Sequence, residues 1–111
     1  MSGTDLLGEF EHLVLLAILQ RGHDGYAIGI RHDIERVTER AVSRGALYRT
    51  LDRLGNKSLV AWELEDAGEK RGNNPRKRFS VTPSGLEALR RSHSVVSQLS
   101  AGLEHVLEQP L

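Results

Sequence analysis

Apolar positions in the first half of the chain recur with the period of an α-helix. Residues 6–20, 24–39 and 43–56 each carry this spacing, with Asp24 and Ser43 at capping positions of the second and third predicted helices. The first helix is apolar nearly all round, which favours burial on more than one side. Its main stripe consists of Phe10, Leu13, Val14 and Ala17, and the second helix carries Tyr26, Ile30, Ile34 and Val37.

The period changes from 3.6 to two after residue 58. Val60, Trp62 and Leu64 alternate with smaller or acidic residues, which predicts a half-buried strand over residues 59–65. A polar segment rich in Gly and Asn follows, and then a second strand over residues 76–82. In that strand Lys77, Phe79 and Val81 lie on one side. The two strands predict a β-hairpin with a long basic tip.

A long helix is predicted from Pro83 to about Glu108, with Thr82 as its cap. Its apolar positions alternate by three and four residues, which is the spacing of a heptad seam. Because no earlier segment is left to cover a helix of this length, we predict a homodimer. The predicted dimer interface comprises Phe10, Leu13, Leu86, Leu89, His93, Val96, Leu99, Leu103 and Leu107.

This order of elements predicts a mainly α fold with a small β-hairpin, namely a winged helix-turn-helix with a long C-terminal dimerisation helix. A chain of 111 residues favours one structural unit, with residues 1–82 as the winged-helix domain and residues 83–111 as the dimerisation helix. The chain contains no Cys, which excludes disulfides and thiolate zinc sites. No signal peptide or membrane span is recognisable, so a cytoplasmic protein without a membrane partner is expected.

Charge is distributed unevenly along the chain. Its 15 basic and 15 acidic residues give a net charge of zero. Residues 40–57 contain five basic residues and one Asp, and residues 70–78 contain five basic residues and no acid. These segments carry +4 and +5, and the remainder therefore carries −9. Such asymmetry predicts one basic face on an otherwise acidic protein.

The two basic segments fall on the third helix and on the hairpin. A recognition helix packs one face on its domain and presents the other to the major groove, and a basic wing can contact flanking phosphates. The amino end of the third helix, with the Ser43 hydroxyl, can also hold a phosphate. A solvated helix whose Arg side chains pair with Asp52, beside a solvated loop, is the alternative. The candidate DNA-binding residues are Ser43, Arg44, Gly45, Tyr48, Arg49, Arg53, Lys70, Arg71, Arg76, Lys77 and Arg78.

Three stretches resemble the PadR family of transcriptional regulators. They are Asp24–Ile28, then Ser43–Tyr48 followed by Leu51 and Leu54, and Pro75–Gly85. The resemblance implies a winged-helix dimer, usually a repressor, in which the third helix enters the major groove. It also implies that Ser43 and Tyr48 lie near the DNA backbone and that the tail helix dimerises with the first helix.

The chain departs from the family pattern at three places. Ala46 stands where the family commonly has Thr or Ser, so one phosphate contact is absent. The segment 55–58 replaces a more regular, Glu-rich end of the third helix. Some short relatives stack flat ligands on a Trp of the dimer helix, but Trp62 lies on a predicted strand here. The mode of ligand binding is therefore not carried over.

Together these features predict a sequence-specific DNA-binding transcriptional regulator, a repressor, that binds a palindromic double-stranded DNA operator as a homodimer. Family members often respond to small molecules, so an effector is a further expected partner. No catalytic constellation, cofactor motif or metal-ligand spacing among the five His residues is recognisable, and neither an enzyme nor a metal site is expected. A winged-helix protein-interaction module without DNA binding is the alternative, because the net charge is zero. The salt dependence of DNA affinity separates the two hypotheses.

Overall fold

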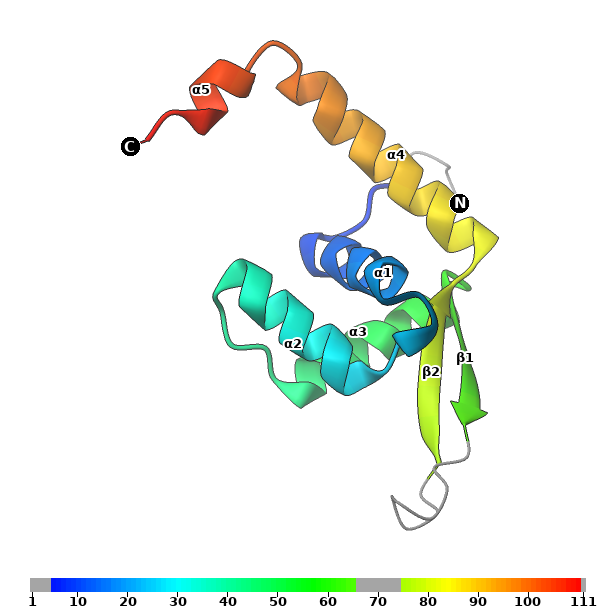
Figure 1. Cartoon of the computed structure of the whole chain (residues 1–111). Coiled ribbons are helices and arrows are strands. Elements are labelled where there is room, and N and C mark those ends of the chain that lie inside the picture. The colour runs from blue at the N-terminus through cyan, green and yellow to red at the C-terminus, as the bar shows by residue number, and fades with distance from the viewer. Residues whose placement is uncertain (1–4, 66–74, 111) are drawn as a thin grey trace.

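The computed structural model describes residues 5–65 and 75–110, which form a helical body, a projecting hairpin and a C-terminal arm (Figure 1). Helices α1, α2 and α3 make the body, and α4 crosses it on the side opposite the hairpin tip. The elements are α1 (Glu9–Arg21), a 3-10 turn η1 (Gly22–Asp24), α2 (Ala27–Thr38), α3 (Arg44–Asn56), β1 (Val60–Glu65), β2 (Arg76–Val81), α4 (Pro83–Ser100) and α5 (Glu104–Glu108).

One hydrophobic core joins the helices to the base of the hairpin. The predicted stripes of α1 and α2 meet there in part, since side chains three and four residues apart share a helix face. Ile30 and Ile34 of α2 are buried, but the prediction is wrong at Val37, which is 69% exposed. Leu16 and Leu19 of α1 are also exposed, so this helix has an apolar side that the described part of the chain does not cover. The largest fully buried side chains are Val14, Leu15, Ile18, Ile30, Leu47 and Leu54, and Phe79 and Leu89 join the same cluster.

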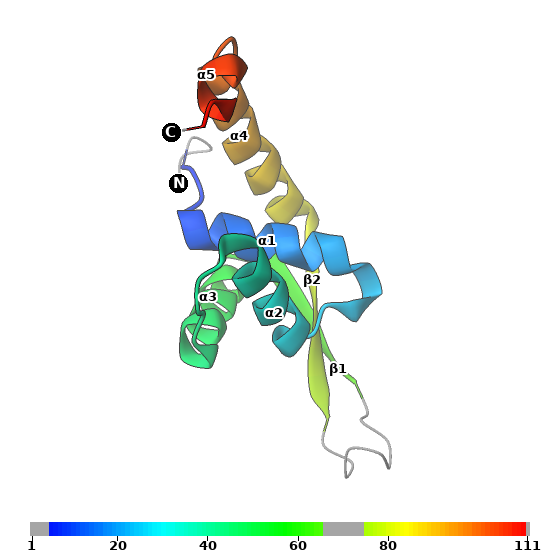
Figure 2. The same ribbon diagram turned by 60° about the vertical axis from the view of Figure 1, so that its left-hand side comes forward.

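The hairpin is antiparallel, with Val60 opposite Val81 and Trp62 opposite Phe79. Val60 and Phe79 are buried, but Trp62 is 47% and Leu64 63% exposed. The expected burial of alternate β1 residues is therefore wrong beyond Val60. The hairpin projects past the helices, as both ribbon views show (Figure 2), so only its base has helices to pack against.

Residues 24–26 adopt an arrangement that the sequence pattern did not indicate. Asp24 was expected to cap α2, but it lies in η1, and the N-cap of α2 is Tyr26. The reason is that the Gly25 carbonyl oxygen accepts a hydrogen bond from the Phe79 N–H of β2 at 2.7 Å. A Cβ at Gly25 would collide with the Phe79 carbonyl oxygen. Glycine thus allows this segment to lie along the free edge of β2.

The C-terminal segment is two helices, and the prediction of one helix reaching Glu108 is wrong. The amino end is as expected, with the Thr82 hydroxyl accepting from the Gly85 N–H at 3.0 Å and Pro83 in the first turn. The helix ends at Ser100 because Ala101 is extended and Gly102 takes a positive φ of 81°. The Ser100 hydroxyl bonds back to the Val96 carbonyl, a contact that competes with continued helix geometry.

The C-terminal arm, which consists of the carboxyl-terminal half of α4 and all of α5, makes the protein elongated. The radius of gyration is 16.1 Å, whereas a compact domain of this length has about 13 Å. Every residue from 101 to 110 is exposed. The carboxyl-terminal half of α4 and all of α5 thus extend away from the body, as Figure 1 shows.

Candidate nucleic-acid interface

The third helix is held on the body by one face and open on another. Its buried side chains are Leu47, Thr50, Leu51 and Leu54, which match the predicted inward stripe. Ser43 is the N-cap, and its hydroxyl accepts from the Ala46 N–H at 3.0 Å. Arg44, Gly45 and Arg49 are exposed. Packing and capping therefore fix α3 so that its amino-terminal half faces solvent.

The amino end of α3 has the properties of an anion site. The N–H groups of Arg44 and Gly45 lie in the first turn and have no acceptor within the helix. The Ser43 hydroxyl accepts from Ala46, which leaves its own proton free to donate. Gly45 has no side chain to keep a phosphate away, and the Arg44 guanidinium lies 5.5 Å from the centre of the Tyr48 ring. Neither Arg44 nor Arg49 forms an ion pair with another described residue.

A buried carboxylate, that of Glu11, contacts two further cations. They are Arg53 of α3 and Lys57, the C-cap of that helix. Glu11 of α1 accepts from the Lys57 ammonium at 2.9 Å and from Arg53 Nε at 3.2 Å. It also accepts from the Gly8 N–H at 3.0 Å. Burial alone would raise the pKa of Glu11, but the Gly8 N–H, Lys57 and Arg53 together lower it below its ordinary value. Arg53, a predicted DNA contact, is thus engaged in joining α3 to α1.

A cluster at the base of the wing surrounds Tyr26. The Tyr26 hydroxyl donates to the Glu65 carboxylate, with its oxygen 2.7 and 2.8 Å from the two carboxylate oxygens. The guanidinium of Arg76 stacks over the Tyr26 ring, 3.5 Å from its centre. The hydrogen bond to Glu65 raises the pKa of Tyr26, with desolvation acting in the same direction. These contacts connect the start of α2 to the last described pair of the hairpin.

The remaining wing cations have different partners. Arg78 lies 3.3 Å from Glu65 and 3.8 Å from Glu63, which are exposed pairs of small energetic weight. The Lys77 ammonium lies 4.1 Å from the centre of the Trp62 ring, on the opposite face of the hairpin. The predicted contacts Lys70 and Arg71 lie outside the described residues.

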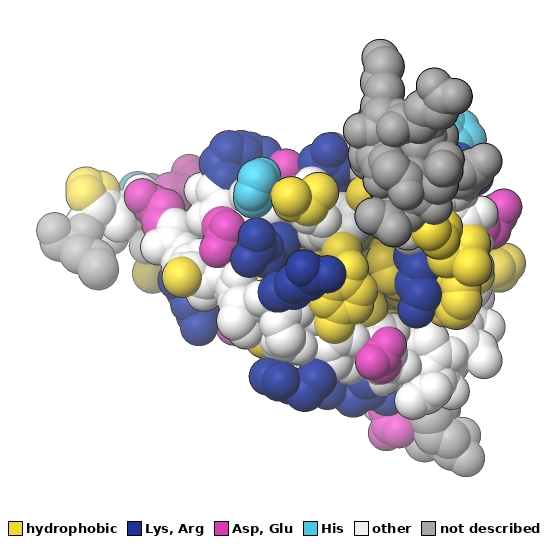
Figure 3. Space-filling model, turned by 90° about the horizontal axis from the view of Figure 1, so that it is seen from below, with side chains coloured by type: hydrophobic (Ala, Val, Ile, Leu, Met, Phe, Trp, Pro, Cys, Tyr) yellow, Lys and Arg dark blue, Asp and Glu magenta, His cyan; other side chains and the backbone are white. Residues whose placement is uncertain are grey.

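Viewed from below, the molecule displays many Lys and Arg side chains, separated by hydrophobic and a few acidic groups (Figure 3). The fold thus brings together α3 and the hairpin, the two elements that carry the basic segments. Sequence reasoning missed the positioning roles of Glu11, Tyr26 and Glu65. An acid within an otherwise apolar helix was the available signal for Glu11, whereas nothing local indicated the long-range partner of Tyr26.

The predicted dimer residues fall into two groups. Leu89 is only 4% exposed and belongs to the protomer's own core, while Phe10, Leu13 and Leu86 are half-buried. The others lie on the arm and are exposed: His93, Val96, Leu99, Leu103 and Leu107. The arm therefore carries an apolar surface that the described part of this chain leaves uncovered.

None of the helices in residues 5–65 and 75–110 is both long and apolar enough to cross a membrane. Within those same ranges, no three His, Asp or Glu side chains gather in a way that could hold a metal ion.

Comparison with known proteins assigns a family to this arrangement. The model of the transcriptional regulator PadR-like family matches residues 15–91. A PadR-like transcription factor from Bacteroides fragilis superposes with a TM-score of 0.70 at 25% identity, over 87% of this chain and 88% of that one. A PadR-like transcriptional regulator from Bacillus cereus gives 0.70 at 22% identity, over 91% and 93%.

A sequence relative is an uncharacterized 37.1 kDa protein of transposon TN4556 from Streptomyces fradiae, which is 38% identical over 88 residues. The match covers 79% of this chain but 23% of the relative, so the chain spans less than a quarter of that protein's length.

Proposed function

Because the chain belongs to the PadR-like family of transcriptional regulators, we propose that it binds a palindromic DNA operator as a homodimer. Helix α3 of each protomer enters a major groove and the hairpin lies along the flanking backbone. The observation that carries this proposal is the open amino end of α3, where Arg44 and Arg49 have no acidic partner among the described residues.

The contacts divide into phosphate and base contacts. The N–H groups of Arg44 and Gly45, with the Ser43 hydroxyl, hold one phosphate, and Tyr48 donates its hydroxyl to the backbone nearby. Arg49, one turn further along the exposed face, reads a base edge. Arg53 supports the helix from behind through Glu11 and makes no base contact.

The wing supplies sequence-independent affinity. The Arg78 guanidinium lies 3.8 Å from the Glu63 carboxylate and 3.3 Å from that of Glu65. Ion pairs near the surface contribute little free energy, so a phosphate can replace these carboxylates. Arg76 and Lys77 lie on the opposite faces of the same strand, and Lys70 and Arg71 precede it in the sequence. A loss of such contacts lowers affinity for all DNA sequences alike.

The uncovered arm supports the homodimer. Val96 and Leu99 are exposed on the second half of α4, beyond the turns that pack on α1. Burying such side chains is favourable by roughly 1.5–3 kcal/mol each, and a second copy supplies a cover of the same chemistry. A two-fold dimer also presents two α3 helices to the two halves of a palindrome.

Repression is the proposed output, because a dimer seated on its operator excludes other proteins from the same DNA. We further propose that a small molecule relieves it. The hollow between α3 and the hairpin, which Tyr48, Trp62 and Lys77 help to line, offers an aromatic surface beside the recognition helix. A ligand there would shift the hairpin relative to α3.

The decisive experiment retains genomic fragments on the purified full chain at near-physiological salt and sequences the retained DNA. An enriched palindrome would establish a sequence-specific dimer and identify its operator. If a folded dimer retained no sequence, and fluorescence anisotropy gave no salt-dependent DNA affinity, the protein-interaction module would replace this proposal. Bound DNA should show a log–log salt slope of about −0.9 per neutralised phosphate.

A further inference from the structure

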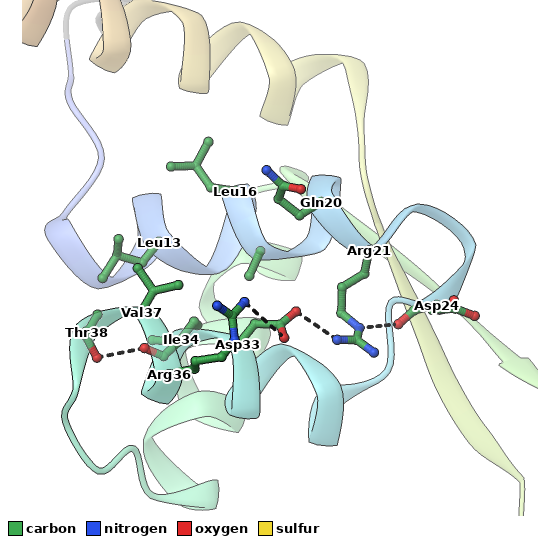
Figure 4. Close-up of a pocket in the computed structure, with 11 residues that line it drawn as sticks. Leu13, Leu16, Gln20, Arg21, Asp24, Asp33, Ile34, Arg36, Val37 and Thr38 are labelled. Atoms are coloured by element: carbon green, nitrogen blue, oxygen red, sulfur yellow. Dashed lines mark hydrogen bonds and ion pairs between the residues drawn. The ribbon is translucent and has the colours of Figure 1, made fainter.

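A groove follows the outer surface of α1 and α2, away from the recognition helix (Figure 4). Its volume is about 570 Å³, and its apolar lining comes mainly from Leu13, Leu16, Ile34 and Val37. Leu13 and Val37 lie at one end of the view and Arg21 and Asp24 at the other. A neighbouring hollow shares Leu13, Ile34 and Thr38 and extends toward the α2–α3 loop, so the apolar surface is elongated.

The groove contains an apolar side chain that its own chain does not use. Val37 falls on the apolar stripe of α2 with Ile30 and Ile34, yet it is 69% exposed whereas those two are buried. Leu16 of α1 is exposed as well. Both side chains line the same groove, and an exposed apolar groove between two packed helices is typical of a surface that binds another polypeptide.

Helix α5 carries a matching apolar face. Leu103, Val106 and Leu107 are spaced by three and four residues, so they share one side of the helix. All three are exposed, Val106 and Leu107 by 62% and 66%. The break at Gly102 separates this face from α4, and α5 runs in a different direction from α4 (Figure 1).

The groove is lined by two Arg and two Asp residues, and the cation among them that is available to an acidic segment is Arg36. In the groove Asp33 is already neutralised by Arg21 at 2.8 Å, whereas Arg36 reaches Asp33 only at 4.0 Å and is 74% exposed. Residues 92–110 include Glu104 and Glu108 but no Lys or Arg. The acidic segment around α5 has an apolar face, and the apolar α1–α2 groove has the available guanidinium of Arg36. The two surfaces are therefore complementary in this respect.

We propose that α5 of one protomer docks its Leu103, Val106 and Leu107 face into the α1–α2 groove of the other, with Glu104 and Glu108 near Arg36. This proposal rests on the homodimer proposed above. The first half of α4 packs on its own α1, where the Leu7 N–H donates to the Ser92 hydroxyl at 3.0 Å. The arm beyond it extends past its own body, and two-fold symmetry makes the exchange reciprocal, so both grooves are filled.

Cysteine cross-linking tests this directly, because the full chain contains no Cys. One preparation carries Val37→Cys and a second, with a size tag, carries Leu107→Cys. The two are mixed, allowed to exchange subunits and treated with a short bismaleimide. The matched control replaces Val37→Cys by Ser80→Cys, an exposed position on the hairpin. The expected result is a tagged–untagged product with the Val37→Cys protein at several times the yield of the Ser80→Cys control.

The outcomes distinguish the docking from the dimer itself. A dimer in sedimentation without the preferred product would overturn the docking and leave the homodimer intact. A monomer at all concentrations would overturn both. A single chain carrying Val37→Cys and Leu107→Cys that links only within itself would show that α5 folds back on its own groove, and would also overturn the docking.

A second measurement avoids chemical modification. Val106→Asp combined with Leu107→Asp should raise the dimer dissociation constant by at least about tenfold, because the two central apolar contacts are replaced by charges. Gln98→Asp adds a charge at an exposed polar position of the same arm and should change it little. Equal dissociation constants for the three proteins would contradict the docking, and circular dichroism establishes that each variant is folded.

Discussion

Arg49 and Arg53 are four residues apart on α3 and look equivalent in the sequence. In the structure Arg49 is exposed without an acidic partner among the described residues, whereas Arg53 contacts Glu11 at 3.2 Å. The difference comes from one carboxylate on α1, 42 residues away in sequence. Two cations of the same helix therefore have different surroundings, and only Arg53 joins α3 to α1 through Glu11.

Replacing Arg49 by Ala should weaken specific binding to the operator by about 1–3 kcal/mol, because a base-reading side chain is lost. Fluorescence anisotropy with specific and scrambled duplexes measures both affinities. Arg90→Ala removes an exposed Arg on α4 and serves as the control. A loss that is equal for both duplexes would instead make Arg49 a phosphate contact.

Glu11 predicts a pH-dependent stability. Its pKa in the folded protein is lowered from the model-compound value of 4.5, so its contribution is present above that pH and is lost as the pH falls through the folded pKa. Glu11→Gln should therefore lower the free energy of unfolding at pH 7 by about 1–2 kcal/mol, as expected for charge-assisted hydrogen bonds. Urea titrations at a series of pH values from 7 downward measure it. A difference between the two proteins that stayed constant over the whole pH range in which both remain folded would contradict this role.

At the scale of elements, the wing is attached to the helices by more than its hydrophobic base. Gly25 pairs with the edge of β2, and Tyr26 reaches Glu65 at the last described pair of β1. This joins the start of α2 to the hairpin. The orientation of the wing relative to α3 is thus determined by contacts that lie between elements.

The close approach at Gly25 can be tested with a single methyl group. Gly25→Ala places a Cβ against the Phe79 carbonyl oxygen, so β2 must shift, and we expect a destabilisation of about 1–3 kcal/mol. Gly55→Ala is the control, since its Cβ meets nothing within 4 Å and helix propensity predicts a gain of up to about 1 kcal/mol. Thermal and urea unfolding measure both. An unchanged stability for Gly25→Ala would show that β2 adjusts freely.

At the scale of the whole molecule, the described part of the chain leaves apolar side chains of α4 and α5 exposed. Its arm presents an apolar surface to solvent, and the elongated shape reflects the part of α4 and α5 that packs on nothing described. A second copy is the proposed cover. DNA binding and dimerisation are coupled in this arrangement, because one α3 recognises only one half of a palindrome.

Leu99 is 76% exposed on the arm and belongs to the proposed interface. Leu99→Asp should shift sedimentation toward the monomer and lower operator affinity at the same time, because the gain from engaging two linked half-sites is lost. Its unfolding at low protein concentration should be unchanged, since Leu99 does not contribute to the protomer core. A dimer with wild-type operator affinity would remove Leu99 from the interface.

Local patterns in the sequence determined the element types, the inward stripe of α3, the part of the α2 stripe formed by Ile30 and Ile34, the caps Ser43 and Thr82, and the uneven charge. They did so because periodicity and capping depend on residues within a few positions of one another. The same information located the two basic segments and the family resemblance, which the family match over residues 15–91 confirmed.

Only the tertiary structure decided which side chains meet. The pairing of Glu11 with Arg53 and Lys57, the edge contact of Gly25, and the exposure of Trp62 all depend on elements distant in sequence. The helix break at Gly102 was also not predicted, because the apolar spacing continues past this residue. In the structure Gly102 adopts a positive φ, which ends the helical geometry. Hydrophobic periodicity and the order of charged residues specify the helices, the strands and the basic segments of this protein. Packing between those elements determines which cations are held by carboxylates and which stay exposed.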